Sequence, residues 1–253
     1  MKWNLMKKMK IRIDEMLLQS GFADELLAAQ AMIRAGTVLV NDRVVDKPGT
    51  LIRSDDSLRV RGRRNFPWVS RAGGKLAYAM EHFSWSPDGC VAIDVGACTG
   101  GFTEVLLCHG AKKVYAVDVG YGELAWKLRQ DPRVVVMERT NARNLTIEQF
   151  SPLPNWVVCD ASFIRLSAIL PAVLGLIQGY TRVIALIKPQ FEVAAYEVGE
   201  GGIVRDSSLH ERVCGEVSEW FLAQGFSVLP IIESPILGTE GNKEFLIGAY
   251  RDN

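Results

Sequence analysis

Apolar runs alternate with helix-like stretches along residues 91–253. This alternation predicts a parallel sheet with helices on both faces. Only a turn-rich loop separates the last two runs, which leaves room for an antiparallel final strand. The runs are VAIDVG, KVYAVDVG, RVVVMER, NWVVCDASF, RVIALIKPQF, FSVLPIIES and KEFLIGAYR.

Residues 11–60 follow a different pattern, which predicts helix, turn, helix and hairpin. Gly36 stands where a helix is expected to end. TVLVNDRVV then indicates two short strands around a turn at Asn41-Asp42, and DKPGTLI and DSLRV add turn and strand signals. The helices carry two apolar stripes at helical spacing: Met16, Leu17 and Phe22, then Leu26, Ala29 and Ile33.

Composition limits the class of protein. A chain of 253 residues, 48% hydrophobic and 23% charged, is typical of a soluble protein of two domains. It has no apolar run of about 18 residues and no apolar core after its basic start, so neither a membrane span nor a signal peptide is expected. Five cysteines without a CxxC pair favour a reducing cytosol over disulfides or zinc. We therefore expect a cytoplasmic protein without a metal.

The formal net charge of zero hides an uneven distribution. Residues 1–75 hold 15 Lys and Arg against 8 Asp and Glu, whereas residues 76–253 hold 14 against 21. A basic first part is typical of polyanion binding, although a solvated basic face gives the same count. In RVRGRRNFPWVSRAGGK, aromatic residues separate the charges. This stretch either contacts a nucleic-acid strand or packs through Trp68 onto the next domain.

A glycine-rich turn follows the first strand in DVGACTGGF. Glycines there permit positive φ and a close approach of a ligand to the backbone, at the sheet edge where α/β proteins bind ligands. Asp94 would repel a pyrophosphate but favour the cationic amino-acid end of S-adenosylmethionine. Asp118, 24 residues further on, can accept from both ribose hydroxyls, and Asn141 follows the third strand, near the expected adenine. A nicotinamide site and a turn without a ligand remain alternatives.

Four charged residues complete the candidate site. Asp160 ends the fourth run and Lys188 the fifth, so both are expected at the same sheet edge. Lys75 precedes the first strand, and Glu244 opens the last. A ribose 2′-hydroxyl is a weak nucleophile that needs a proton acceptor while its bond to a methyl group forms. A lysine oriented by a carboxylate can accept that proton late, and a second lysine can hold the developing oxyanion.

Several motifs resemble one family. SRAGGKL, DVGACTGGFTEVLL, ERTNAR, DASFI, KPQFE and GGIVRD are similar to the TlyA family, also called haemolysin A, in which an S4 RNA-binding domain precedes an FtsJ-like methyltransferase domain. RIDEMLLQSG, AQAMIRAGTVLVN and DKPGT resemble the S4 domain. The resemblance implies a small α+β domain at 1–61, a linker at 62–70 and, at 71–253, a Rossmann-like methyltransferase domain with a seven-stranded, mostly parallel sheet.

The same resemblance implies methylation of ribose 2′-hydroxyls in ribosomal RNA, with cytidine as the nucleoside. Lys188 is then the proton acceptor, Asp160 modulates it, and Lys75 and Glu244 position the hydroxyl. The S-adenosylmethionine-binding residues would be Asp94, Gly96, Ala97, Thr99, Gly100, Gly101, Phe102, Asp118, Asn141, Ala142 and Asp160. The RNA-binding residues would be Arg12, Arg34, Arg43, Lys47, Arg61, Arg63, Arg64, Trp68 and Arg71.

Other functions stay open. An RNA-binding protein with an inactive methyltransferase domain would bind RNA without turnover. Methylation of a base or small molecule would favour an NPPF-like turn or a catalytic cysteine on the fourth strand, whereas CDAS stands there and Cys159 is expected to face the core. A membrane-active haemolysin should show membrane-seeking helices or lipid-facing strands, and the sequence contains neither pattern.

Overall fold

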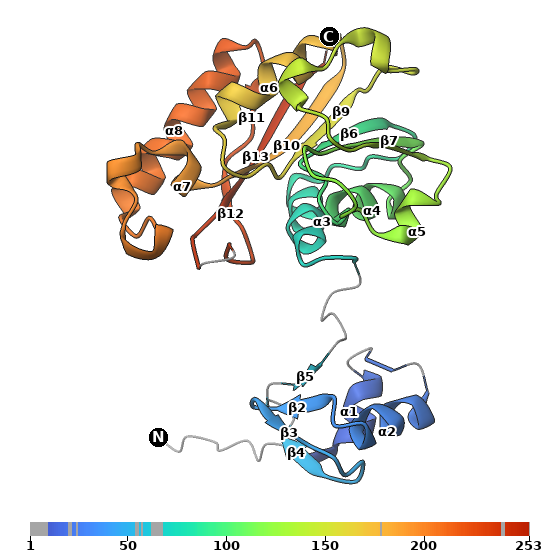
Figure 1. The fold of residues 1–253 in the computed structure, drawn as a ribbon. Helices are drawn as coiled ribbons and strands as arrows, with labels where there is room; N and C mark the ends of the chain where they lie inside the picture. The colour runs from blue at the N-terminus through green and yellow to red at the C-terminus, as the bar shows by residue number, and fades with distance from the viewer. Residues whose placement is uncertain are drawn as a thin grey trace. The chain divides into compact units, whose positions relative to one another are not determined.

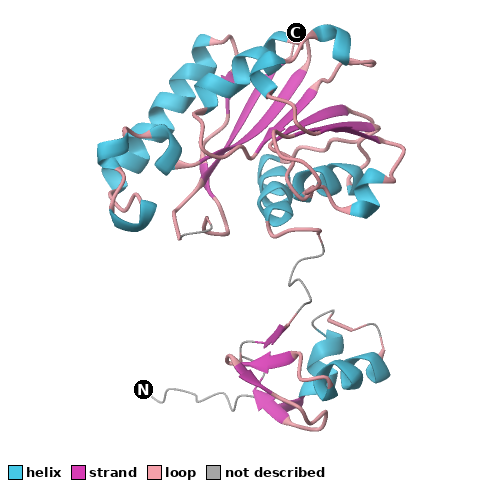
Figure 2. Cartoon of the chain, in the orientation of Figure 1, coloured by secondary structure: helices cyan, strands magenta, loops and turns pink. Residues whose placement is uncertain are grey.

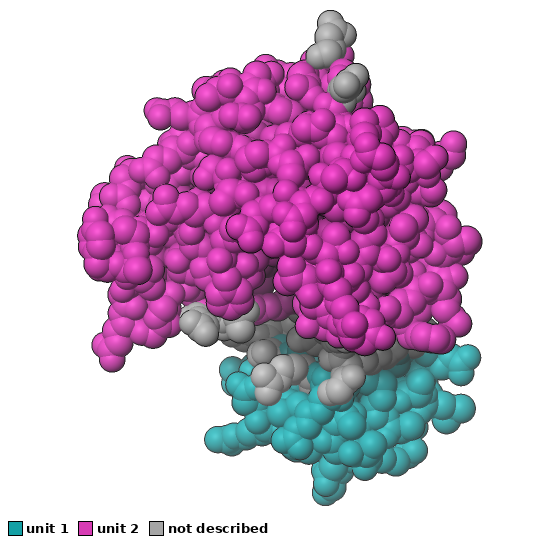
Figure 3. Space-filling model, turned by 45° about the horizontal axis from the view of Figure 1, so that its top comes forward, with its two compact units in different colours: residues 1–67 teal, residues 68–253 magenta. Residues whose placement is uncertain are grey.

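A computed structural model describes residues 10–19, 22–23, 25–53, 56, 58–61, 68–177, 179–238 and 241–252. Contacts divide the chain into two compact units, residues 1–67 and residues 68–253 (Figure 3). Residues 68–70 of the expected linker belong to the second unit by their contacts, and residues 62–67 lie outside the described residues. The domain limits at 61 and 71 stay predictions.

Among its described residues, the first unit contains two short helices and two small sheets (Figure 1). β1 pairs antiparallel with β4, and β2 pairs antiparallel with β3 and β5. The predicted order of helix, helix and hairpin is confirmed. The elements are β1 (Lys10–Arg12), α1 (Ile13–Gln19), α2 (Leu26–Arg34), β2 (Val38–Val40), β3 (Arg43–Val44), β4 (Leu51–Arg53) and β5 (Leu58–Val60).

The turns of the first unit are as expected, and its core differs at one position. Gly36 follows α2 at φ +67°, the left-handed conformation in which glycine ends helices. Asn41 and Asp42 form the β2–β3 turn at φ 48° and 63°. The prediction that Leu26 is part of the apolar stripe is wrong, because this side chain opens α2 and is 44% exposed. The core includes Ile13, Leu17, Ala29, Ile33, Val38 and Ile52.

The second unit is a three-layer α/β domain (Figure 2). Its strands are β6 (Val91–Val95), β7 (Lys113–Val117), β8 (Val134–Met137), β9 (Trp156–Cys159), β10 (Thr181–Ile187), β11 (Ser227–Val228), β12 (Ile232–Glu233) and β13 (Phe245–Arg251). Its α-helices are α3 (Ala72–Phe83), α4 (Gly101–Cys108), α5 (Trp126–Arg129), α6 (Leu166–Gly175), α7 (Pro189–Glu192) and α8 (Ser207–Ala223). Short 3-10 helices cover Ala142–Asn144, Ile147–Gln149, Ala195–Glu197 and Glu200–Gly202.

The sheet has the order β11-β13-β10-β9-β6-β7-β8, and β12 also pairs with β13. The five strands from β8 to β10 are parallel, and β13 runs antiparallel to β10, which confirms the mostly parallel sheet and the antiparallel final strand. The run FSVLPIIES, expected as one strand, forms β11 and β12. Pro230 lies between these strands and has no N–H to donate to a sheet. In the residues that the structure describes, the sheet therefore has eight strands, not seven.

Helices cover both faces of this sheet (Figure 1). Successive strand side chains point to opposite faces, so Ala92 packs with α3 and α4, whereas Ile93 packs with α6. Cys159 is fully buried in the core on the α6 side of the sheet, as predicted. Within the described parts of the chain, no helix has the length and apolar character needed to cross a membrane.

Candidate functional site

The turn between β6 and α4 depends on glycine at two positions. Gly96 has φ +82°, and a Cβ there would lie 3.0 Å from the backbone of Ala161 in the loop after β9. Gly100 has φ +94°, and a Cβ there would overlap the side chain of Leu128. A side chain at either position would strain the backbone and displace a neighbouring segment. The turn is therefore packed closely against the loop after β9 and against α5.

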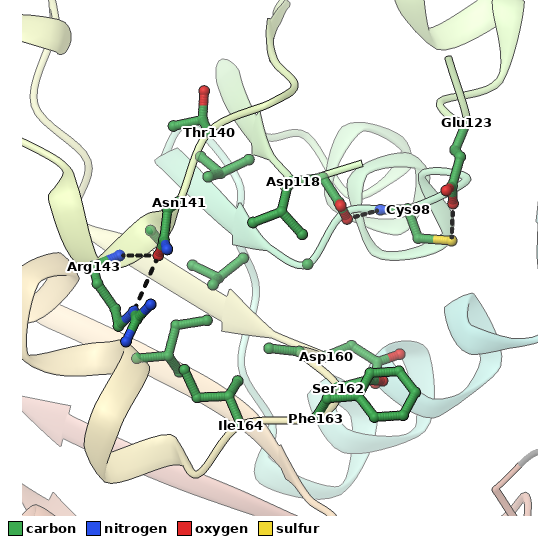
Figure 4. Close-up of a pocket in the computed structure, with 17 residues that line it drawn as sticks. Cys98, Asp118, Glu123, Thr140, Asn141, Arg143, Asp160, Ser162, Phe163 and Ile164 are labelled. Atoms are coloured by element: carbon green, nitrogen blue, oxygen red, sulfur yellow. Dashed lines mark hydrogen bonds between the residues drawn. The ribbon is translucent and has the colours of Figure 1, made fainter. Parts of the chain in front are cut away.

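A cavity of about 440 Å³, here called the large cavity, opens beyond the carboxyl ends of β6, β7 and β9 (Figure 4). Asp118 is held by two backbone amides: Oδ1 accepts from Gly120 N at 2.7 Å, and Oδ2 accepts from Cys98 N at 2.8 Å. Its carboxylate thus joins the loop after β7 to the glycine turn. Of the expected cofactor residues, Gly96, Asp118, Asn141, Ala142 and Asp160 line this cavity.

Asn141 lies on another side of the large cavity from Asp118 (Figure 4). Its Oδ1 accepts from the backbone N of Arg143 at 3.1 Å and from Arg143 Nε at 3.3 Å. The side-chain oxygen of Asn141 is therefore used within the loop. Its Nδ2 group is the part of the amide that remains to donate to a ligand.

Asp94 is completely buried beneath the glycine turn and lines none of the described cavities. Its Oδ2 accepts from Thr103 Oγ1 at 2.7 Å, while Oδ1 has no hydrogen-bond partner among the described residues. Burial raises the pKa of Asp94 to about 7, against the opposing effect of the Thr103 hydrogen bond. A buried carboxyl with an unused acceptor fits a cationic group bound at the turn.

The four charged candidates meet in a second cavity of about 250 Å³, here called the charged cavity. Lys75 Nζ lies 2.5 Å from Glu244 Oε2, and Lys188 Nζ lies 2.7 Å from Asp160 Oδ1. These side chains are at most 15% exposed, so both are buried ion pairs, and each ion would be costly to bury without its partner. Of the glycine turn, Gly96, Ala97, Thr99, Gly101 and Phe102 also line this cavity, whereas Gly100 does not.

A third cavity of about 420 Å³, here called the aromatic cavity, shares Lys188 and Glu244 with the charged cavity. The rings of Phe163 and Phe191 line it, with centroids 4.9 Å apart. Gln190 also lines it, and its Oε1 is buried with no hydrogen-bond partner in the described parts of the chain. The site predicted from the sequence did not include Phe163, Gln190 or Phe191. Phe163 lies in the motif DASF, and Gln190 and Phe191 lie in KPQF, so the resemblance had already indicated this region.

The expected RNA-binding residues of the first unit differ in their surroundings. Arg12 donates to both carboxylate oxygens of the buried Asp14, at 2.9 and 2.6 Å, so its guanidinium is partly used inside the unit. Arg34 makes a contact of 3.4 Å with Gln30 Oε1. Arg43, Lys47 and Arg61 are exposed. Arg63 and Arg64 lie outside the described residues.

The segment before α3 packs within the second unit, against α3 and α4. The ring centroids of Trp68 and His109 lie 6.0 Å apart. A Cβ on Gly73 would lie 2.6 Å from Cγ of Trp68. Val69 N donates to the buried carboxylate of Glu104 at 2.5 Å. These contacts support the alternative in which Trp68 packs onto the second domain. Arg71 lines the charged cavity.

Among the residues that the structure describes, no three acidic, histidine or cysteine side chains are placed to hold a metal ion.

Comparison with known proteins gives matches over most of the chain. Residues 68–251 match the FtsJ-like methyltransferase family, and residues 11–58 match the S4 domain. The 16S/23S rRNA (cytidine-2′-O)-methyltransferase TlyA of Mycobacterium tuberculosis is 42% identical over 94% of this chain and 89% of its own. Hemolysin A of Brachyspira hyodysenteriae is 40% identical over 93% of this chain and 98% of its own.

Solved structures agree with these relatives. A protein from Streptococcus thermophilus that shares the hemolysin label is 42% identical, with a TM-score of 0.73, over 96% of this chain and 89% of its own. An S-adenosylmethionine-dependent methyltransferase from Mesorhizobium loti, 13% identical with a TM-score of 0.50 over 69% of this chain and 96% of its own, shares the fold alone. This chain belongs to the FtsJ-like methyltransferase family, in the group of TlyA and hemolysin A, and carries an S4 domain ahead of its methyltransferase domain.

Proposed function

We propose that this chain is an S-adenosylmethionine-dependent methyltransferase that methylates a ribose 2′-hydroxyl of ribosomal RNA, with cytidine as the nucleoside. The observation that carries the proposal is the charged cavity, where two lysines, each paired with a carboxylate, adjoin the large cavity. The name of the M. tuberculosis relative supports the ribose hydroxyl, the nucleoside and the RNA. Because its substrate is ribosomal RNA, the protein works in the cytoplasm.

The residues around the large cavity fit S-adenosylmethionine, which when bound supplies a methyl group on a positively charged sulfur. Each oxygen of Asp118 accepts one backbone N–H and keeps a second lone pair for a ribose hydroxyl. Asn141 would donate to the adenine through Nδ2. The turn at Gly96–Gly101 would hold the amino-acid end, and the carboxyl of Asp94 beneath it would favour the positive charge of that end.

The two ion pairs have different parts in the reaction. Lys188 takes the proton of the 2′-hydroxyl as the new O–C bond forms, and Asp160 orients Lys188 and stabilises its positive charge. Lys75 donates to the oxygen that develops negative charge, and Glu244 holds Lys75 in place. Because both pairs are already buried and paired, little reorganisation is needed when the charge develops.

The aromatic cavity suits the base of the target nucleotide. RNA bases taken out of a helix are commonly stacked on aromatic side chains and bonded along their edges. Phe163 and Phe191 supply the aromatic surface, and the amide of Gln190 supplies a polar group. The base would then lie beside Lys188 and Glu244, which brings its own ribose close to the charged cavity. Arg43, Lys47 and Arg61 of the first unit are exposed and can contact phosphates.

The test uses the full-length protein, S-adenosylmethionine with a labelled methyl group, and both ribosomal subunits from cells that lack the gene. We expect label on a ribose 2′-oxygen of the ribosomal RNA, located by mass spectrometry of RNA fragments. Label on a base, or no label in either subunit, would contradict the proposal. RNA binding without transfer would favour the inactive-domain alternative, and leakage from liposomes caused by the same protein would favour the haemolysin.

The part assigned to Lys188 is tested by Lys188→Ala. We expect this variant to bind S-adenosylmethionine normally in calorimetry and to transfer no methyl group. Lys112→Ala, at an exposed lysine that lines none of the three cavities, is the matched control and should be as active as the unaltered protein. Unchanged turnover in Lys188→Ala would exclude this lysine from the mechanism.

A further inference from the structure

Ser162 lies where the large cavity, the charged cavity and the aromatic cavity meet. It follows Asp160 in the loop after β9, and it lines the large cavity, the charged cavity and the aromatic cavity. Ser162 is exposed at the surface of the cavities. The residue is therefore next to the places assigned above to the cofactor, to the reacting hydroxyl and to the base.

Ser162 also contacts the nitrogen of Lys188. Lys188 Nζ donates to Ser162 Oγ at 2.8 Å and to the backbone oxygen of Asp160 at 3.1 Å. The carboxylate oxygen Asp160 Oδ1 is 2.7 Å from the same nitrogen, yet among the described residues it has no partner whose angles are those of a hydrogen bond. The ion pair therefore attracts Lys188, while Ser162 and the Asp160 carbonyl supply the directional bonds.

Directional bonds matter because a lysine side chain is long and flexible, and its ammonium rotates freely. The nitrogen has four tetrahedral directions, of which one is the bond to Cε. Two more are fixed by the bonds to Ser162 Oγ and to the carbonyl of Asp160. Only one direction then remains from which Lys188 can accept a proton. A carboxylate alone would leave that direction variable.

We propose that Ser162 is a positioning residue for methyl transfer, whose hydroxyl fixes the orientation in which Lys188 Nζ receives the proton. The proposal rests on the function proposed above. Lys188 reacts as the neutral amine, its ammonium having first released one proton to solvent. The O2′–H proton then passes to the lone pair of Nζ, the O2′–CH₃ bond forms, and the S–CH₃ bond breaks with its electron pair left on sulfur. Ser162 keeps its own proton throughout and only accepts a hydrogen bond from Lys188.

Three variants of the full-length protein separate this role from a general structural one. Ser162→Ala removes the acceptor, Ser162→Thr keeps the hydroxyl, and Ser207→Ala changes an exposed serine that lines none of the three cavities. We expect Ser162→Ala to lower kcat about 10- to 100-fold, since a small misplacement of a reacting group has effects of this size. KM for the ribosomal subunit and the affinity for S-adenosylmethionine should stay within about twofold of those of the unaltered protein.

The kcat of Ser162→Thr shows whether the hydroxyl of residue 162 is what positions Lys188. Ser162→Thr should restore kcat to within about threefold, and Ser207→Ala should not change it. An unchanged kcat in Ser162→Ala would overturn the role of Ser162, and so would a kcat in Ser162→Thr as low as in Ser162→Ala. If the unaltered protein transfers no methyl group to the subunits, the proposed function itself fails, and the inference fails with it.

A second measurement needs no activity. In ¹H–¹⁵N spectra of the cofactor-free protein, the ammonium of Lys188 is identified by the signal that Lys188→Arg removes. Because hydrogen-bonded ammonium protons exchange slowly with water, we expect this signal in the unaltered protein and in Ser162→Thr, and its loss in Ser162→Ala. A signal that is equally sharp in Ser162→Ala would show that other groups orient Lys188.

Discussion

Replacing Asp94 with asparagine should change how the stability of the second unit depends on pH. Asp94 is completely buried, and burial raises its pKa from 3.8 to about 7. Between these two values the folded protein retains a proton that the unfolded chain has lost. The free energy of unfolding therefore falls as the pH rises from about 4 to about 7, and this contribution stays constant at higher pH. The asparagine side chain in Asp94→Asn does not ionise, so the variant would lack this dependence.

The size of the effect follows from the two pKa values. A change from 3.8 to about 7 corresponds to about 4 kcal/mol, at about 1.4 kcal/mol for each pH unit. The hydrogen bond from Thr103 is already included, because it lowers the pKa and so reduces the effect of burial. Most of this free energy should be lost between pH 5 and pH 8, where a carboxyl in the unfolded chain is ionised throughout.

Urea unfolding at pH 5, 6, 7 and 8, followed by tryptophan fluorescence, measures this dependence, since Trp156 is buried in the second unit. Relative to the unaltered protein, Asp94→Asn should gain about 3 kcal/mol between pH 5 and pH 8. Glu197→Gln is the control. Arg212 lowers the pKa of Glu197 to about 2, so the stability from this pair is complete above pH 4.5 and is lost only at lower pH. Parallel stability curves for Asp94→Asn and the unaltered protein would refute the reasoning.

Three further changes test the site and its support. Asp118→Ala should weaken S-adenosylmethionine binding at least about tenfold in calorimetry, and an unchanged affinity would remove Asp118 from the cofactor site. Gly100→Ala should lower the melting temperature and abolish cofactor binding, because a Cβ there would overlap Leu128. Gly175→Ala should do neither, because a Cβ there would meet no other segment of the described chain within 4 Å. Arg182→Ala should lower the free energy of unfolding by about 2 kcal/mol, because the guanidinium of Arg182 lies within 5.4 Å of three aromatic ring centroids. A decrease of less than about 0.5 kcal/mol would contradict a stabilising role for Arg182.

Much of the fold could be predicted because it depends on local patterns. Buried parallel strands are continuous apolar runs, and the glycine turn follows the first of them. The errors arose where local pattern and tertiary position disagree. Leu26 has the spacing of a core residue but lies at the start of its helix, and Pro230 divides an apolar run into two strands.

The candidate site was less accessible to sequence reasoning. Strand order placed Asp160 and Lys188 at one sheet edge, but Lys75 and Glu244 come from distant segments, and only the resemblance to a family assigned all four to one site. Their spacing along the chain contains no information about the 2.5 Å between Lys75 and Glu244. The aromatic cavity was missed because Phe163 lies in a loop, and Gln190 and Phe191 lie in the short helix α7. In such segments the direction of a side chain depends on the packing of other segments.

The position of β13 has a consequence for partly folded molecules. This strand is the last element along the chain, yet it lies inside the sheet between β10 and β11, and Glu244 directly precedes it. A molecule whose five parallel strands have assembled but whose final strand has detached would leave Lys75 without its counter-ion. Catalytic competence should therefore appear only with the last step of sheet assembly, so an incompletely folded copy would be inert toward ribosomes.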